Sequence, residues 1–315
     1  MTALISDRPS EKFSHPDITA KGETRAYVAY SGTQTLWFNT GTLCNIECAN
    51  CYIESSPTND RLVYLSLNDV TPFLDELDAA GETPIEIGLT GGEPFMAPEI
   101  ISILDACLSR GHEVLLLTNA MQPMMRPRVM EGLLAIKETY GERLTLRISL
   151  DHYSRRYHDE ERGAGSFDLT LKGMIWLAEN GFQMAIAGRT MWHEPEDEAR
   201  EGYRALVLEH DLKLDVDNPK SLVLFPEMET QDDPPEITTD CWGILNKDPE
   251  EVMCASQRMV VKRKGQEATV LACTLIPYDE RFELGATLEE SRKPVSLNHK
   301  FCASFCVLGG GSCSA

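Results

Sequence analysis

The chain has 315 residues with 50 acidic and 29 basic side chains, which gives a net charge of −21. Clustered Lys and Arg supply most of the affinity for a phosphate backbone, so this acidity argues against a nucleic-acid partner. No window offers the roughly 18 consecutive apolar residues of a membrane span. The N-terminal segment also lacks the basic-then-apolar order of a signal peptide. We expect a cytoplasmic protein with no membrane partner.

Between residues 35 and 226, short β-rich runs alternate with longer amphipathic stretches. The pattern predicts strands at 35–40, 84–90, 113–118, 143–151, 182–190 and 220–226. It predicts helices near 67–80, 97–110, 126–140, 166–180 and 196–210. Strict alternation implies parallel strands joined by right-handed crossovers. We therefore expect an α/β protein with either an open doubly wound sheet or a partial barrel.

Residues at the predicted helix ends support these assignments. Ser66 or Asn68 stands before the first helix, and Ser166 is the expected N-cap of the fourth. Glycine tolerates the left-handed backbone that ends many helices. Three glycines follow predicted helix ends, namely Gly81, Gly111 and Gly181.

After residue 226 the composition changes. Residues 226–240 are acidic and Pro-rich, which is typical of a linker or an exposed loop. Runs at 259–263 and 268–273 predict a β-hairpin. The last fifteen residues are too short and too small in side chain to form a core, so metal ligation would hold them in place. We expect three parts: an N-terminal extension (1–34), a barrel (35–226), and a linker with an auxiliary domain (227–315).

Ten cysteines in a chain without an export signal need a role other than disulfide formation. Cys44, Cys48 and Cys51 follow the first predicted strand with Cys-x3-Cys-x2-Cys spacing. Three thiolates this close can bind three corners of one 4Fe-4S cube and leave its fourth iron open. The alternatives are a zinc site without its fourth ligand, although the motif holds no His, and a chance grouping.

The turn Gly91-Gly92-Glu93-Pro94 follows the second predicted strand. Adjacent glycines let a ligand approach the backbone closely, and a carboxylate beside them can pair with an ammonium group. Such a turn is a weak signal when it stands alone. Here it shares with the cysteine loop the carboxyl edge of the strands, where α/β barrels place their chemistry.

At these residues the chain resembles the radical S-adenosylmethionine (radical SAM) superfamily, whose signature is Cys-x3-Cys-x2-Cys followed by Gly-Gly-Glu. The resemblance covers roughly residues 30 to 226 by the order of elements, and residues 147–167 also resemble the matching region of many members. It implies a partial (β/α)6 TIM-like barrel with a small C-terminal β-hairpin domain. It also implies an enzyme that reductively cleaves SAM to a 5′-deoxyadenosyl radical, which abstracts hydrogen from a substrate.

By that resemblance the first three cysteines hold a 4Fe-4S cluster, and the amino and carboxylate groups of SAM chelate its open iron. Glu93, beside Gly91 and Gly92, accepts the SAM amino group. Ser149 and Arg162 are the implied contacts to the SAM carboxylate.

Two further positions belong to the implied cofactor site. Asn119 ends the third predicted strand and is the implied contact to ribose or substrate. The chain departs from the family where an aromatic residue often precedes the third cysteine, because Asn50 stands there and Tyr52 follows Cys51 instead. Tyr52 is therefore the candidate contact to adenine.

The C-terminal cysteines resemble the auxiliary-cluster domains of the superfamily, called SPASM or, when shortened, twitch. Cys254 and Cys273 flank the predicted hairpin and are the firmest pair. The remaining candidates, in the tail, are Cys306, Cys302 and Cys313.

Five or six cysteines after residue 240 are too few for two fully ligated cubes, so we expect one auxiliary 4Fe-4S cluster, a candidate electron acceptor. The tail spacing departs from the SPASM pattern, so which four cysteines ligate stays open, and zinc is the alternative metal. Cys107, in a predicted amphipathic helix, is expected to be a core residue.

The expected partners are a substrate and a reductant. About thirty residues precede the first predicted strand, too few for a leader-binding module, which favours a small-molecule substrate or a peptide presented by another protein. Lys262, Arg263 and Lys264 form a basic run that is either a docking point for a flavodoxin or ferredoxin or an ordinary hairpin turn. The alternative function is a non-catalytic iron-sulfur or zinc protein in assembly or regulation, against which Glu93 beside two glycines argues.

Overall fold

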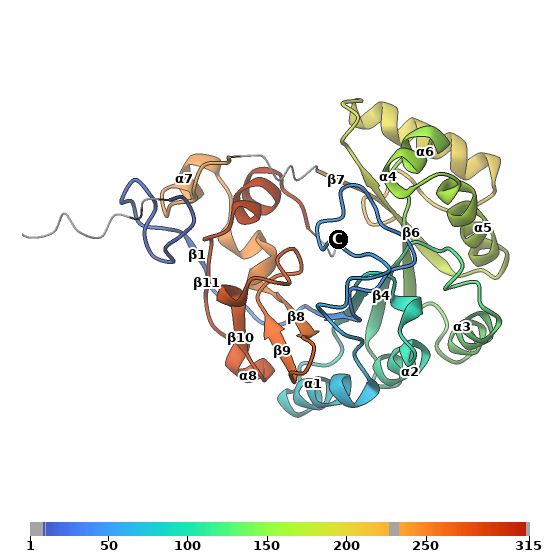
Figure 1. Cartoon of the computed structure of the whole chain (residues 1–315), viewed down its shortest axis with the longest axis horizontal. Helices are drawn as coiled ribbons and strands as arrows, with labels where there is room; N and C mark the ends of the chain where they lie inside the picture. The colour runs from blue at the N-terminus through green and yellow to red at the C-terminus, as the bar shows by residue number, and fades with distance from the viewer. Residues whose placement is uncertain (1–8, 10, 227–232, 313–315) are drawn as a thin grey trace, which may run out of the picture.

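The computed structural model describes residues 9, 11–226 and 233–312. Its main sheet contains six parallel strands that pair in sequence order (Figure 1). These are β2 (Thr35–Asn39), β3 (Glu86–Thr90), β4 (Glu113–Thr118), β5 (Leu144–Ser149), β6 (Gln183–Arg189) and β7 (Leu222–Phe225). All six lie where strands are predicted, which confirms the α/β partial-barrel fold. The sheet stays open, since β7 forms one of its edges.

Five amphipathic helices connect these strands and cover the outer face of the sheet (Figure 1). They are α1 (Leu67–Ala80), α2 (Ile100–Ser109), α3 (Pro127–Tyr140), α5 (Ser166–Glu179) and α6 (Glu196–Glu209). Helix α1 shows how apolar spacing sets the buried face, because its buried residues Val70, Phe73, Leu74 and Leu77 recur every three or four positions. Cys107 of α2 is fully buried in the same core, as predicted.

The helix ends agree with the sequence in part. Ser66 caps α1 in a reciprocal capping box with Asp69, and Gly81 ends that helix in the left-handed conformation at φ 68°. The predicted cap of α5 is wrong. Gly165, at φ 81°, is the N-cap, and Ser166 is the first helical residue. The glycine can adopt a backbone conformation there that a serine cap would not.

Helix α4 (Arg155–Arg162) has no counterpart among the predicted elements. Its sequence RRYHDEER lacks an apolar stripe, which is the signal that periodicity detects. The side chains that it buries are His158 and Glu161. This helix therefore directs polar groups toward the interior, next to the cysteine loop.

The C-terminal part continues the main sheet. Strand β8 (Gln257–Lys262) pairs in parallel with β2, and β9 (Ala268–Leu271) and β10 (Glu283–Gly285) follow in antiparallel order. The predicted hairpin is thus confirmed, and it extends the barrel sheet. Because β8 pairs directly with β2, the division at residue 226 stays a prediction.

A segment near the N-terminus lies beside a segment of the C-terminal part, where the labels β1 and β11 are neighbours in Figure 1. Strand β1 (Tyr27–Val28) pairs with β11 (Val295–Ser296). A second core joins residues of both ends, among them Val28, Ile237 and Phe305. The short helices of this part are α7 (Cys241–Leu245), α8 (Leu288–Ser291) and a π-helix (Cys302–Leu308). Within the described ranges, no helix is long and apolar enough to cross a bilayer.

Candidate active site

The loop that follows β2 carries the first three cysteines. Cys44 is buried, and its backbone N–H donates to the carbonyl of Ser56 at 3.1 Å. Cys48 and Cys51 are half-buried. Burial raises the pKa of Cys44 to about 12 and raises that of Cys48, while the nearby Arg162 guanidinium opposes the shift in both. Among the described residues, no three His, Cys, Asp or Glu side chains are gathered tightly enough to hold a single metal ion.

The glycines of the Gly-Gly-Glu turn make room for the cysteine loop. A Cβ on Gly91, which has φ 146°, would lie 2.5 Å from the carbonyl oxygen of Gly41. A Cβ on Gly92 would lie 2.3 Å from the carbonyl oxygen of Leu43. The Gly92 N–H donates to Gly41 at 2.8 Å, and the Glu93 N–H donates to Leu43 at 3.2 Å. The close approach expected of a ligand is therefore made by the chain's own backbone, one residue before Cys44.

Gly92→Ala should consequently displace the cysteine loop. The new methyl group meets backbone, which cannot move aside, so we expect the free energy of unfolding to fall by about 1–3 kcal/mol. Bound iron per chain should fall with it. Gly243→Ala, in α7, is the matched control because its Cβ meets nothing within 4 Å, and alanine is the better helix former. Equal iron content in the two variants, measured after reconstitution, would contradict this account.

Glu93 joins the ends of β3 and β4. Its carboxylate is buried and accepts from the Phe95 N–H at 3.0 Å, the Thr118 hydroxyl at 2.9 and 3.0 Å, and the Asn119 N–H at 2.8 Å. Burial raises the pKa of Glu93 to about 6, and these hydrogen bonds oppose the shift. Glu93 does not line the adjoining pocket, and its contact to the SAM amino group stays a prediction.

Asn119 supports the cysteine loop from the end of β4. Its Nδ2 donates to the side-chain oxygen of Asn45 at 2.9 Å, and its Oδ1 accepts from the N–H of Met121 at 3.0 Å. Both partners line the pocket. Asn119 thus lies behind the pocket wall, and its contact to ribose or substrate remains untested.

Arg162 is a half-buried cation of the site. Its Nε and Nη2 donate to the two carboxylate oxygens of Asp151 at 2.6 and 2.9 Å. Burial lowers the pKa of Arg162, but the charge and hydrogen bonds of Asp151 together with the charges of Cys48 and Cys51 outweigh it, and the net shift is upward. Arg162 lines the pocket, whereas Ser149 and Tyr52, which is 39% exposed, do not. The proposed roles of all three residues stay predictions.

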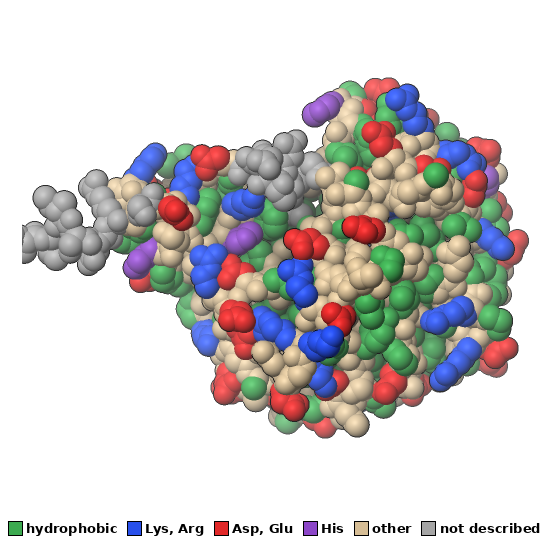
Figure 2. Space-filling view, viewed as in Figure 1, with side chains coloured by type: hydrophobic (Ala, Val, Ile, Leu, Met, Phe, Trp, Pro, Cys, Tyr) green, Lys and Arg blue, Asp and Glu red, His purple; other side chains and the backbone are tan. Residues whose placement is uncertain are grey.

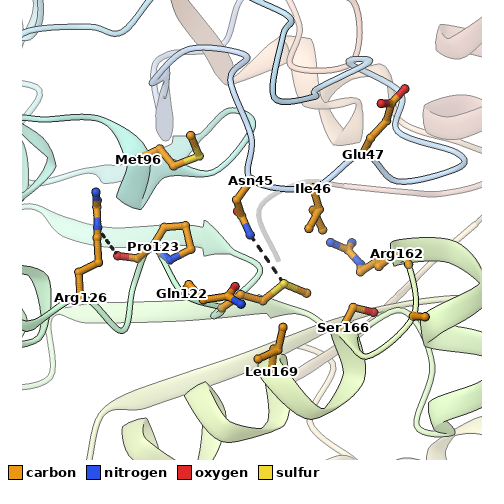
Figure 3. A pocket seen from close by; sticks show the side chains of 13 residues that line it. Asn45, Ile46, Glu47, Met96, Gln122, Pro123, Arg126, Arg162, Ser166 and Leu169 are labelled. Carbon is orange, nitrogen blue, oxygen red and sulfur yellow. Dashed lines mark hydrogen bonds between the residues drawn. The ribbon is translucent and has the colours of Figure 1, made fainter.

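A pocket of about 700 Å³ lies beside the cysteine loop. Figure 3 shows side chains from four segments around it. The cysteine loop, the turn after β3, the segment after β4 and the α4–α5 region supply Asn45, Ile46, Glu47, Met96, Met121, Gln122, Pro123, Arg126, Arg162, Gly163, Ala164, Ser166 and Leu169. Its size lies in the range of cofactor sites, and its apolar wall carries a few charged groups, as such sites do.

Several residues that line the pocket are not among the predicted site residues. For Asn45 and Glu47 a signal exists, because both lie inside the Cys-x3-Cys spacing. Arg126 lines the pocket from the segment after β4, and its Nε donates to the carbonyl of Pro123 at 3.0 Å. No motif marks Arg126 in the sequence.

Four C-terminal cysteines line a second, small cavity of about 20 Å³. They are Cys254, Cys273, Cys302 and Cys306, and the other lining residues are apolar. Burial raises the pKa of Cys254 and of Cys302 to about 12. Cys241 does not line this cavity, and Cys313 lies outside the described residues. The structure therefore brings together the pair that flanks the hairpin and two cysteines of the tail.

The family model of the radical SAM superfamily matches residues 38–204, more than half of the chain. The antilisterial bacteriocin subtilosin biosynthesis protein AlbA of Bacillus subtilis (strain 168) is 35% identical over 154 residues, which are 47% of this chain and 32% of AlbA. The AdoMet-dependent heme synthase of Methanosarcina barkeri (strain Fusaro / DSM 804) is 31% identical over 144 residues, which are 45% of this chain and 38% of that protein. The matched regions span about a third of these relatives.

Among solved structures, SuiB of Streptococcus suis bound to S-adenosylmethionine has a TM-score of 0.58 at 14% identity. The alignment covers 81% of this chain and 64% of SuiB. SuiB bound to its precursor peptide SuiA gives a TM-score of 0.55 at 14% identity over 89% of this chain and 66% of SuiB. At such identities the likeness concerns the fold. From the family match together with the cysteine loop and the Gly-Gly-Glu turn, the chain belongs to the radical SAM superfamily.

Proposed function

We propose that the protein is an enzyme that reductively cleaves SAM and uses the resulting 5′-deoxyadenosyl radical to abstract hydrogen from a substrate. One observation carries the proposal. Asn45, Ile46 and Glu47 of the three-cysteine loop and the cation Arg162 line a single pocket of about 700 Å³, inside the region that matches the family. The Gly-Gly-Glu turn supports that loop through its backbone contacts.

The donor set fits a 4Fe-4S cluster, because three thiols on one loop can hold three irons and leave the fourth open to SAM. Cys44, Cys48 and Cys51 would be these ligands. When bound, the cluster supplies the electron that breaks the bond between sulfur and C5′ of SAM. The protein's part is to bind, orient and exclude competing reactions.

The charged residues of the site would orient SAM. Asp151 holds Arg162 through Nε and Nη2, which leaves Nη1 for the SAM carboxylate. Burial raises the pKa of Glu93 to about 6, and in its ionised form the carboxylate would attract the SAM ammonium group. Tyr52, Asn119 and Ser149 stay candidate contacts to the rest of the cofactor.

The cavity of the four C-terminal cysteines would hold an auxiliary 4Fe-4S cluster. Its donor set is complete for one cluster, since Cys254, Cys273, Cys302 and Cys306 line the same cavity. Zinc is the competing metal by residue type, because four thiols also suit a structural zinc site, but in the part of the chain that the structure describes no three such side chains are gathered as closely as a single ion requires. We retain residues 227–315 as the proposed auxiliary domain.

For the substrate we infer a peptide. AlbA is named for the biosynthesis of a bacteriocin, and SuiB has been solved with a precursor peptide. The heme synthase among the relatives supports the other class, a small molecule. Product analysis with candidate precursor peptides distinguishes the two classes.

A flavodoxin or ferredoxin is the proposed reductant. The basic run at the β8–β9 turn is a poor docking point for it, because all three cations pair with acids of this chain. Lys262 contacts Asp69 at 2.7 Å and Arg263 contacts Glu283 at 2.6 Å, while Lys264 pairs with Asp60. On the face in Figure 2, basic and acidic side chains are likewise interspersed.

The test is anaerobic reconstitution followed by reduction in the presence of SAM. We expect 5′-deoxyadenosine together with about eight irons per chain, four for each cluster. A protein that binds its full metal complement and SAM yet forms no 5′-deoxyadenosine with any reductant would instead be a non-catalytic metalloprotein.

A further inference from the structure

We propose that Glu161 and Asn50 form a polar clamp that fixes the segment between Cys48 and Cys51, which makes Glu161 a positioning residue for the cluster site. The Asn50 N–H donates to Oε1 of Glu161 at 2.8 Å, and the Asn50 side-chain amide donates to Oε2 at 2.8 Å. The Ala49 N–H donates to the backbone carbonyl of Glu161 at 2.9 Å. The proposal rests on the proposed cluster at these cysteines.

These contacts involve both residues that lie between the second and third cysteines. Ala49 and Asn50 are the only two positions between Cys48 and Cys51, and both direct their backbone N–H groups to Glu161. Glu161 of α4 therefore accepts from both backbone N–H groups that lie between Cys48 and Cys51.

The burial of Glu161 makes the clamp rigid. Its side chain is 2% exposed, and Arg189 compensates its charge at 2.6 Å through Oε1. The N–H of Arg189 in turn donates to the carbonyl of Asp151 at 3.0 Å. Since buried ion pairs hold only in good geometry, the network leaves Glu161 little freedom to move.

The same helix places the cation of the site. Arg162 follows Glu161 in α4 and lies close enough to Cys48 and Cys51 for their charges to interact. A displacement of Glu161 would move Arg162 as well. The clamp thus couples the cysteine segment to the side chain proposed to bind the SAM carboxylate.

Asn50 is matched to Glu161 chemically. An amide donates to a carboxylate, whereas an aspartate at position 50 would set a second carboxylate against the buried one of Glu161. In the double variant Asn50→Asp/Glu161→Gln, the amide and the carboxylate exchange places. The net charge facing Arg189 is then unchanged, and the side-chain hydrogen bond can form in the reverse direction.

The experiment compares Asn50→Asp, Glu161→Gln and the double variant. We expect Asn50→Asp to lose iron to a chelator about tenfold faster than the wild type, because one charge-assisted hydrogen bond corresponds to a factor of about ten. The variant should also lose hydrogen-exchange protection at residues 49–51. The double variant should regain most of both. A double variant as impaired as Asn50→Asp would overturn the clamp. If Asn50→Asp fails to fold, its rescue by Glu161→Gln tests the same coupling.

The matched control for Glu161→Gln is Asp69→Asn, because Asp69 is likewise a carboxylate that accepts from a backbone N–H and pairs with a cation, at Ser66 and Lys262. It should lower thermal stability without hastening iron loss. If iron loss in Asp69→Asn and Asn50→Asp follows only their stability, Glu161 is merely structural. Both readouts are independent of SAM cleavage, so a protein inactive on SAM would refute the proposed function and leave the clamp standing.

Discussion

Cys48→Ala should abolish the formation of 5′-deoxyadenosine and remove about four irons per chain, because a cube bound by two thiols loses its hold. Cys44→Ala and Cys51→Ala should behave alike. Cys48 is half-buried, so its replacement opens no core cavity and the fold should persist. Iron analysis and a SAM-cleavage assay on the same sample measure both effects.

Cys107→Ala is the control for this series. Cys107 is fully buried in the main core on α2, outside the cysteine loop and the second cavity, so its loss should lower the free energy of unfolding by about 1 kcal/mol with no change in iron. SAM cleavage at the wild-type rate in any variant of Cys44, Cys48 or Cys51 would refute the ligand assignment.

Cys302→Ala should remove the other half of the iron and leave SAM cleavage in place. Cys302 lines the second cavity with three other cysteines, and none of these lines the pocket beside the cysteine loop. Cys241→Ala is the control, since Cys241 lies outside that cavity and its sulfur accepts from the N–H of Thr238 at 3.3 Å.

The same variant tests what the second site does. If the site takes an electron from the substrate radical, Cys302→Ala should form 5′-deoxyadenosine but no oxidised product. If the site only holds the C-terminal segment, both yields should fall together with the folded fraction. A wild-type site filled with zinc would exclude the redox role, because zinc does not change oxidation state.

Most of the fold can be predicted from local sequence patterns. The six parallel strands and their five helices follow from hydrophobic periodicity. Helix α4 was not predicted, because it buries His158 and Glu161 in place of an apolar stripe. Periodicity cannot identify a helix whose inward face is polar.

In the candidate site too, features set by local spacing can be predicted, and contacts between distant residues cannot. Spacing alone marked Cys44, Cys48 and Cys51, whereas the contact between Asn50 and Glu161 joins residues 111 positions apart and leaves no local trace. The sequence indicates a close backbone approach at Gly91 and Gly92 but does not identify the segment that approaches. In the structure this segment is the cysteine loop, at Gly41 and Leu43.

The pairing of β2 with β8 has a consequence for how the chain is made. Thr35 of β2 meets Gln257, about 220 residues later, and such distant contacts form slowly. At 5–20 residues per second, a ribosome needs about 10 to 40 s to bring β8 out, and until then one edge of β2 stays open to other chains. Trp37 and Phe38, which pack into different cores, make both faces of this strand apolar. The strand that leads into the cysteine loop therefore gains its second neighbour only late in synthesis, and we expect metal insertion to follow completion of the chain.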